Sequence, residues 1–238
     1  RAGYAWTHLA HCEEFLHKIF TDNSVTGRQI SNDLRFDQGD ENKFTTLYQP
    51  VDLVVRSFAI SATISKSDRR YKKKNILWAG RFHRQKNIKL AIDIAVLMPE
   101  YDFIFAGGFA DDMHLNGIKT PENVNFVGPY NNFNSLSLEN ISLFLYTSSW
   151  DGLPNILLEV GSCEIPIIAR DIGGISDLVN MDTGWIVDAN EDALSFSKRI
   201  RDVFSDESEK DRRVGNMHDL IRTRHSWNAF LETASKYL

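Results

Sequence analysis

The chain has 238 residues, of which 42% are hydrophobic and 25% charged, and its formal net charge is −5. This length and composition are typical of one large globular domain, or of one domain and part of another. The negative charge disfavours a protein that mainly wraps nucleic acid, and two cysteines cannot build a disulfide framework. No segment approaches the roughly 18 uninterrupted apolar residues of a membrane span. We therefore expect a soluble cytoplasmic protein.

The first fifty residues hold too few elements to make a domain. They predict a strand at Lys18–Ser24, a helix at Thr26–Leu34, a polar loop at Arg35–Lys43 and an extended segment at Phe44–Leu53. The chain begins with Arg1 and has no signal-peptide pattern, so we expect it to be a fragment of a longer protein.

Short apolar runs alternate with helical or loop segments from Asn75 to Asp188. Such runs, without strict polar alternation, are typical of strands that are covered on both faces. The pattern predicts an α/β fold, a Rossmann-like parallel sheet with helices on both faces. The predicted strands are 75–80, 102–108, 124–128, 141–147, 166–170 and 185–188, and the predicted helices are 86–98, 153–164, 192–204, 207–223 and 227–238.

Arg81 and Lys86 are candidate ligand-binding cations in the segment Gly80–Lys86 (GRFHRQK), which follows the first of these strands. Arg81 and Lys86 fall between the end of a strand and the start of a helix, where open α/β sheets bind ligands. Together they could clamp a diphosphate, Arg81 with its planar fork and Lys86 as a point charge. The alternative is that both are solvated surface residues.

The segment Ser148–Glu159 (SSWDGLPNILLE) follows a later strand and opens a helix. Gly152 leaves room for a ligand near the backbone, and Pro154 suits a first helical turn. The amides of Gly152, Leu153 and Asn155 lie around a helix start, whose dipole favours a phosphate.

Two carboxylates flank this helix start. Asp151 precedes the helix, and Glu159 lies about two turns along it. A carboxylate can accept hydrogen bonds from the neighbouring hydroxyls of a ribose or a sugar ring. The alternative is that Asp151 caps the helix and Glu159 is solvated.

A third turn, in the segment Ala169–Val179, contains Gly173 and Gly174 between a strand and a helix. Such a turn frees backbone amides for an anion, although strand-to-helix turns of this kind are common.

The order and spacing of these features closely resemble the C-terminal, donor-binding domain of family 4 glycosyltransferases, which are retaining enzymes of the GT-B fold. The matching motifs are GR-x4-K, V-x-F-x-G (Val124–Gly128), S-x2-(D/E)-G-x-P-x3-LE and P-x-I-A-x-D-x-GG. The resemblance covers about Asn75–Leu238.

The resemblance implies roles for these residues. Glu159 would hold the donor ribose, Asp151 the transferred sugar, and Arg81 with Lys86 the leaving diphosphate. The backbone of Gly152–Asn155 would cradle sugar and phosphate, and Gly128–Tyr130 would lie beside the base. One position departs from the family, because Asp151 stands where the family usually has Glu.

The resemblance also implies a function. The protein would transfer a sugar from a UDP- or GDP-linked donor to a hydroxyl of a saccharide or lipid-linked acceptor, without a metal or other cofactor. Residues 1–55 would be a remnant of the acceptor domain and its connection, and residues 56–238 the donor domain. Because the acceptor site would lie in the missing domain, we expect this chain to bind donor and transfer little. Relatives of this kind serve polysaccharide assembly, which places the protein in the cytoplasm or at the inner membrane face.

Two other classes stay open. A non-catalytic glycosyltransferase-like binding module is compatible with Asp151, whereas a nicotinamide-dependent oxidoreductase needs a G-x-G-x-x-G turn that Phe105–Ala110 does not provide. His8, His11 and Cys12 fit no standard zinc spacing, and Asp111–Asp112 lacks the context of a metal motif. We interpret the basic run Arg69–Lys74 as a solvated linker, His83 as a surface-loop residue, and Cys163 and Trp150 as packed side chains.

Overall fold

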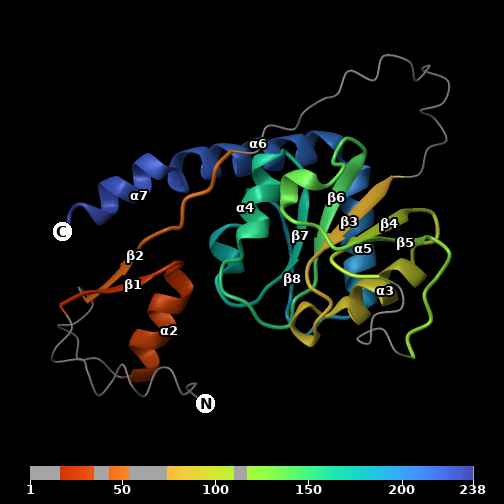
Figure 1. Cartoon of the computed structure of the whole chain (residues 1–238), viewed down its shortest axis with the longest axis horizontal. Helices are drawn as coiled ribbons and strands as arrows, with labels where there is room; N and C mark the ends of the chain where they lie inside the picture. Colours follow the sequence, from red (N-terminus) through yellow and green to blue (C-terminus); the bar gives the residue numbers. More distant parts are fainter. Residues whose placement is uncertain (1–16, 35–42, 54–73, 110–116, 238) are drawn as a thin grey trace.

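The computed structural model describes residues 17–34, 43–53, 74–109 and 117–237 (Figure 1). Its centre is a sheet of six strands in the order β5-β4-β3-β6-β7-β8, and every neighbouring pair is parallel. The predicted α/β fold is confirmed. The strands are β3 (Asn75–Ala79), β4 (Asp102–Ala106), β5 (Val124–Gly128), β6 (Ile141–Tyr146), β7 (Ile167–Arg170) and β8 (Trp185–Val187).

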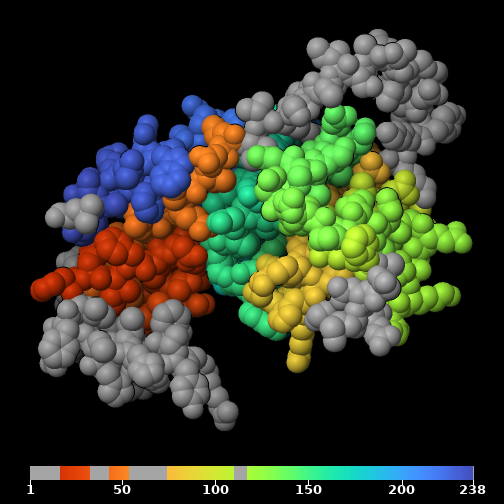
Figure 2. All heavy atoms as spheres, viewed as in Figure 1, coloured from red at the N-terminus to blue at the C-terminus, as the bar shows by residue number. Residues whose placement is uncertain are grey.

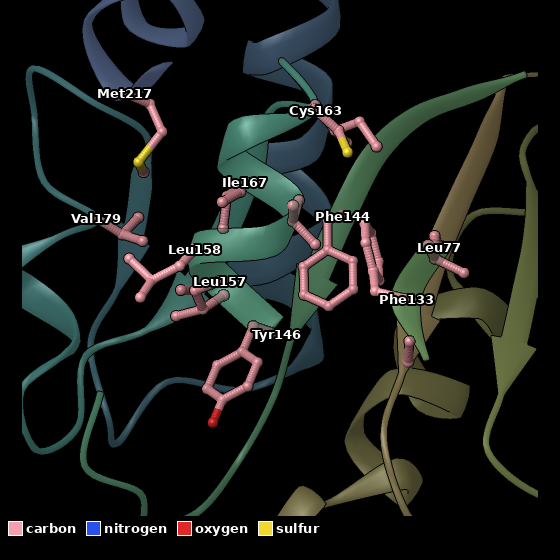
Figure 3. Packing of buried hydrophobic residues seen from close by; sticks show 14 of the residues in the cluster. Leu77, Phe133, Phe144, Tyr146, Leu157, Leu158, Cys163, Ile167, Val179 and Met217 are labelled. Atoms are coloured by element: carbon pink, nitrogen blue, oxygen red, sulfur yellow. The ribbon is translucent and has the colours of Figure 1, made fainter. Parts of the chain in front are cut away.

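Helices cover both faces of this sheet. The helices α3 (Ile88–Val96) and α5 (Ala193–Ser205) share one buried cluster with the strands, and α4 (Asn155–Ser162) and α6 (Glu207–Arg224) share the other. Strand side chains alternate between the faces, as the pleat requires, so that Trp78 joins the first cluster and Leu77 the second. Figure 3 shows the second cluster, in which the apolar side chains of α4 pack against those of β6 and β7.

The strand order reverses at β3, and open α/β sheets commonly have a crevice at the carboxyl edge at such a point. The chain passes outward from β3 through β4 to β5 and then returns to form β6 on the other side of β3. At such a reversal the turns after the two central strands diverge to opposite faces, and open α/β sheets bind their ligands there. The turns after β3 and β6 are the ones that carry Arg81, Lys86 and Asp151.

The N-terminal residues form a small unit of β1 (Ile19–Thr21), α2 (Ser24–Leu34) and β2 (Phe44–Thr46), with the two strands parallel. The last helix, α7 (Trp227–Ala234), runs from the end of α6 to this unit (Figure 1). There the Tyr237 hydroxyl lies 3.1 Å from Thr45 Oγ1, and the Tyr237 ring packs edge-on against Phe20.

Several predictions fall outside the described residues. They concern the boundary between residues 55 and 56, the group His8, His11 and Cys12, the pair Asp111–Asp112 and most of the basic run Arg69–Lys74. Cys163 is buried, as predicted.

The carboxylate of Asp177 joins the N-terminal unit to the main sheet. Asp177 lies in η7 (Ile175–Asp177), just after the Gly-Gly turn, and it accepts hydrogen bonds from the Ser24 amide at 2.5 Å and the Ser24 hydroxyl at 2.8 Å. Asn23 packs on Gly174 so closely that a Cβ there would lie 2.2 Å from its amide carbon. The start of α2 is therefore fixed against the turn after β7.

Replacing Asp177 by Ala should loosen the N-terminal unit and leave the sheet intact. Hydrogen bonds to a charged group contribute about 1.5–3 kcal/mol. We expect faster hydrogen exchange in residues 19–34, measured by mass spectrometry, with β3 and β6 unchanged. Asp211→Ala, at an exposed site on α6, is the matched control. Equal exchange in residues 19–34 of both variants would show that Asp177 does not hold this unit.

Candidate anion-binding site at the carboxyl edge of the sheet

The turns after β3 and β6 are bound to each other by hydrogen bonds. The Ser149 amide donates to the Gln85 carbonyl at 2.8 Å, and the Gln85 side chain donates to the Trp150 carbonyl at 3.0 Å. The Thr147 hydroxyl donates to the Lys86 carbonyl at 2.9 Å. These bonds fix the backbone on both sides of the crevice, so side chains of the two turns meet in a set geometry.

Asp151 is the meeting point of these side chains. Its Oδ2 lies 2.6 Å from Lys86 Nζ and accepts a hydrogen bond from the Tyr146 hydroxyl at 2.5 Å, while its Oδ1 accepts from the Gly152 amide at 3.2 Å. The Lys86 and Asp151 side chains are only 16% and 18% exposed. Burial and the bond to Asp151 raise the pKa of Tyr146, so the phenol stays protonated and keeps donating. In Figure 3 this hydroxyl points away from the apolar cluster.

The helix that follows begins without a capping side chain. The N-cap of α4 is Pro154, an extended residue, and no side chain accepts a hydrogen bond from the first turn. The proposed alternative, in which Asp151 caps the helix, is therefore wrong, because the Asp151 carboxylate is held by Lys86 and Tyr146 instead. The first turn of α4 keeps amides and a positive dipole end that can receive an anion.

Glu159 lies half-buried on the second turn of α4. Burial raises the pKa of its carboxyl group, and within the described part of the chain this carboxylate has no hydrogen bond or ion pair. Burial also raises the pKa of Tyr130, and the negative charge of Glu159 adds to the effect, which places the two side chains near one another. Glu159 is therefore not fully solvated, contrary to the alternative interpretation.

Arg81 differs from Lys86 in its surroundings. Its side chain is exposed and forms no hydrogen bond or ion pair among the described residues. His83, between the two cations, is exposed and accepts a hydrogen bond from the Gln85 amide, which starts the short helix η4 (Arg84–Lys86). Of the two predicted cations, Arg81 is thus exposed and unpaired among the described residues, and Lys86 is paired with Asp151.

Sequence reasoning missed two features of this edge. Asp22 comes from the N-terminal unit, and its Oδ2 would lie 3.3 Å from a Cβ on Gly152. Trp150, predicted to pack, is 52% exposed beside Asp151. Asp22 carries no sequence signal, since it reaches Gly152 only through the contacts that α2 makes with η7, whereas the place of Trp150 next to Asp151 in the sequence left open that it faces a ligand.

The structure therefore brings Lys86, Asp151 and Gly152 into one cluster, with Arg81 on the same turn. The other predicted residues lie around it, with Leu153 buried, Pro154 and Asn155 at the start of α4, and Gly128 and Tyr130 at and beyond the end of β5. Figure 2 shows the green-teal atoms of this region in view between the red N-terminal unit and the yellow turn after β3.

The described residues hold no group of three or more His, Cys, Asp or Glu side chains placed to bind a metal ion. None of their helices combines the length and the apolar character that crossing a bilayer requires.

The fold is an open α/β domain with a Rossmann-like parallel sheet, and comparison with known proteins gives the family. The family glycosyl transferases group 1 matches residues 60–218, and the chain belongs to it. It is 28% identical over 135 residues to the O-antigen biosynthesis glycosyltransferase WbnH of Escherichia coli, a match that covers 55% of this chain and 38% of WbnH. It is 26% identical over 224 residues to the capsular polysaccharide biosynthesis glycosyltransferase CapM of Staphylococcus aureus, covering 84% of this chain and 52% of CapM.

Solved structures share the fold. HepE of Anabaena in complex with UDP superposes with a TM-score of 0.78 at 14% identity, covering 98% of this chain and 68% of HepE. TarM superposes with a TM-score of 0.75 at 16% identity, covering 97% of this chain and 45% of TarM. The chain thus has the GT-B fold, and its matches span 38% of the length of WbnH and 52% of that of CapM.

Glu159→Gln should raise the thermal stability of the protein at neutral pH. The folded protein raises the pKa of this carboxyl group above its ordinary value of about 4.3. The charged form is therefore disfavoured by folding, and this loss of stability is present above the folded pKa and disappears as pH falls below the ordinary value. We expect a higher Tm for Glu159→Gln at pH 7 and no difference near pH 3.5. Glu139→Gln, at an exposed site, should show neither effect. A lower Tm at pH 7 for Glu159→Gln would contradict this assignment.

Proposed function

We propose that this chain binds a nucleotide-sugar donor at the carboxyl edge of its sheet and that the whole protein transfers the sugar to a hydroxyl acceptor. One observation carries the proposal: the pair of Lys86 and Asp151 lies just before the start of α4, which has no side-chain cap, and Arg81 is on the same turn as Lys86. Positive groups gathered at a helix start suit a diphosphate. HepE, which shares the fold, binds UDP and UDP-glucose, which favours a UDP-linked donor here over a GDP-linked one.

Each site residue then has a role. Arg81 and Lys86 hold the diphosphate, and the amides of Gly152, Leu153 and Asn155 complete the cradle with Pro154 fixing the turn. Asp151 accepts from hydroxyls of the transferred sugar and Glu159 from those of the ribose. Gly128 and Tyr130 lie beside the base.

The chemistry needs stabilisation of a leaving nucleoside diphosphate and of an oxocarbenium-like sugar. The bond from the anomeric carbon to the diphosphate oxygen breaks, and its electron pair stays on the diphosphate. Lys86 and the α4 amides, held by the fold, would face that charge with exposed Arg81 beside them, and preorganised charge of this kind is commonly a large part of catalysis. We propose that these groups do the work of a metal ion, and that a hexose is transferred with retention.

The acceptor is a saccharide or a lipid-linked saccharide. The names of WbnH and CapM specify O-antigen and capsular polysaccharide biosynthesis, which favours a role in surface polysaccharide assembly. A relative from Streptococcus pneumoniae, 31% identical over 106 residues, is an alpha-galactosylglucosyldiacylglycerol synthase, whose name implies a lipid acceptor. Such an acceptor would draw the protein to the inner membrane face.

A non-catalytic binding module is a second candidate. It is favoured by the state of Asp151, whose Oδ2 is already engaged by Lys86 and Tyr146. Donor binding by the whole protein without sugar transfer or donor hydrolysis would support this candidate over the enzyme.

Lys86→Ala should weaken nucleoside diphosphate binding by about 10-fold to 150-fold, the effect of losing one charge-assisted contact. Calorimetry with UDP, GDP and ADP measures it. Lys89→Ala is the matched control, because Lys89 is exposed on α3 and pairs with Asp93 instead. Unchanged affinity in Lys86→Ala would overturn the diphosphate assignment.

The role of Glu159 predicts a dependence on the ribose. The wild-type protein should bind UDP more tightly than 2′-deoxy-UDP, because the carboxylate accepts a hydrogen bond from the hydroxyl that the second ligand lacks. In Glu159→Ala the two ligands should bind equally, with UDP weakened by about 5-fold to 100-fold. Glu139→Ala serves as the control. Discrimination that persists in Glu159→Ala would assign the ribose to another residue.

A further inference from the structure

An exposed aromatic ring lies at the mouth of the sheet edge, on the turn after β4. Phe109 is 57% exposed and lies three residues after the end of β4 (Ala106). Its ring covers Gly128, the last residue of β5, where a Cβ would lie 2.6 and 2.7 Å from two ring carbons. Gly128 also has a φ of +81°, so a residue with a side chain would be strained there and would displace the ring.

The turn that carries Phe109 is held by contacts with β5 and with the Phe82 ring. The Gly107 amide donates to the Gly128 carbonyl at 2.8 Å, which joins the ends of β4 and β5. Gly108 lies on the Phe82 ring, where a Cβ would come within 2.5 Å of a ring carbon. Phe82 in turn packs edge-on against Phe126 of β5. The backbone of the turn is therefore held, and one face of the Phe109 ring stays open to solvent.

The Phe109 ring lies near both ends of the proposed nucleotide site. The turn touches the diphosphate end of the proposed site, because a Cβ on Gly107 would lie 1.9 Å from the Gly80 carbonyl oxygen, next to Arg81. It also touches the base end, because the ring lies on Gly128, which begins the Gly128–Tyr130 segment. An exposed aromatic face between these two ends is suited to stacking against a nucleobase.

We propose that Phe109 is the stacking platform for the base of the donor nucleotide, a positioning residue that the motif pattern does not include. This inference rests on the proposed nucleotide-sugar binding and adds the group that holds the base. Stacking acts on the π-face that every base has, so Phe109 contributes affinity to UDP, GDP and ADP alike. Because the ring carries no charge, it contributes nothing to the diphosphate alone.

The test compares a ligand that has a base with one that has none. Calorimetry measures UDP and inorganic pyrophosphate against the full chain and its variants. Phe109→Ala should lower the affinity for UDP by about 5-fold to 150-fold, the range for stacking one base on one aromatic ring. The affinity for pyrophosphate should stay within about 2-fold of the wild-type value. Phe109→Trp should retain UDP affinity, and Phe109→Leu, which is apolar but has no ring face, should lose most of it. Phe20→Ala, at an exposed phenylalanine (43%) on β1, is the matched control.

The outcomes separate this inference from the proposed function. Wild-type binding of UDP with unchanged affinity in Phe109→Ala overturns the platform and leaves the donor site standing. Equal losses of affinity for UDP and for pyrophosphate also overturn the stacking role of Phe109, because they would mean that the substitution distorts the turn after β3. Wild-type protein that binds none of UDP, GDP and ADP overturns the proposed function and, with it, the inference.

Discussion

Two backbone contacts at the carboxyl edge of the sheet are too close for any side chain, and the site depends on them. A Cβ on Gly107 would lie 1.9 Å from the Gly80 carbonyl oxygen, and a Cβ on Gly173 would lie 1.9 Å from the Asp151 carbonyl oxygen. Both glycines have a positive φ, +125° and +52°, which only glycine adopts without strain. The first contact joins the turns after β3 and β4, and the second joins those after β6 and β7. The backbones that carry Arg81, Lys86 and Asp151 are thereby fixed before any ligand arrives, which is the preorganisation that electrostatic catalysis requires.

Within this frame the pair of Lys86 and Asp151 serves position more than stability. A partly buried ion pair adds little net stability, because the cost of removing both charges from water offsets their attraction. The pair does hold the ammonium at the crevice, since Asp151 is itself fixed by Tyr146 and by the Gly152 amide. A bound diphosphate would share this ammonium with the carboxylate, whereas exposed Arg81 would bind it without breaking a protein contact. The two side chains thus differ, because Lys86 is held by Asp151 and Arg81 is exposed and unpaired among the described residues.

The sequence predicts the sheet well because its strands are short apolar runs, and the central strands β3 and β6 are buried on both faces. The predicted run at 75–80 became β3 (Asn75–Ala79), and that at 141–147 became β6 (Ile141–Tyr146). The helix predicted to start at Leu153 begins instead at Asn155, because Pro154 stays extended. The partners of Asp151 were not predictable. In the sequence, Tyr146 is indistinguishable from the other apolar strand residues. Its hydrogen bond to Asp151 depends on the direction in which its hydroxyl points at the strand end, which only the structure shows. The contact of Ser24 with Asp177 joins residues 153 positions apart and has no local pattern at all.

The polar groups that this fold leaves unpaired gather at one edge, and their distribution is a physical argument for where a ligand belongs. The helices α3, α5, α6 and α7 each begin with a side chain that accepts from the first turn, and α4 does not. Within the described residues, the buried side-chain atoms without a hydrogen-bond partner are Ser148 Oγ, just after β6, and Arg170 Nε, at the end of β7. Each such group costs about 1–3 kcal/mol of stability, and folded proteins pair nearly all of them. Half-buried Glu159 adds a carboxylate in the same state. Among the described residues the unpaired buried groups thus lie at the carboxyl ends of β6 and β7, and a ligand with phosphate and hydroxyl oxygens would supply the missing partners.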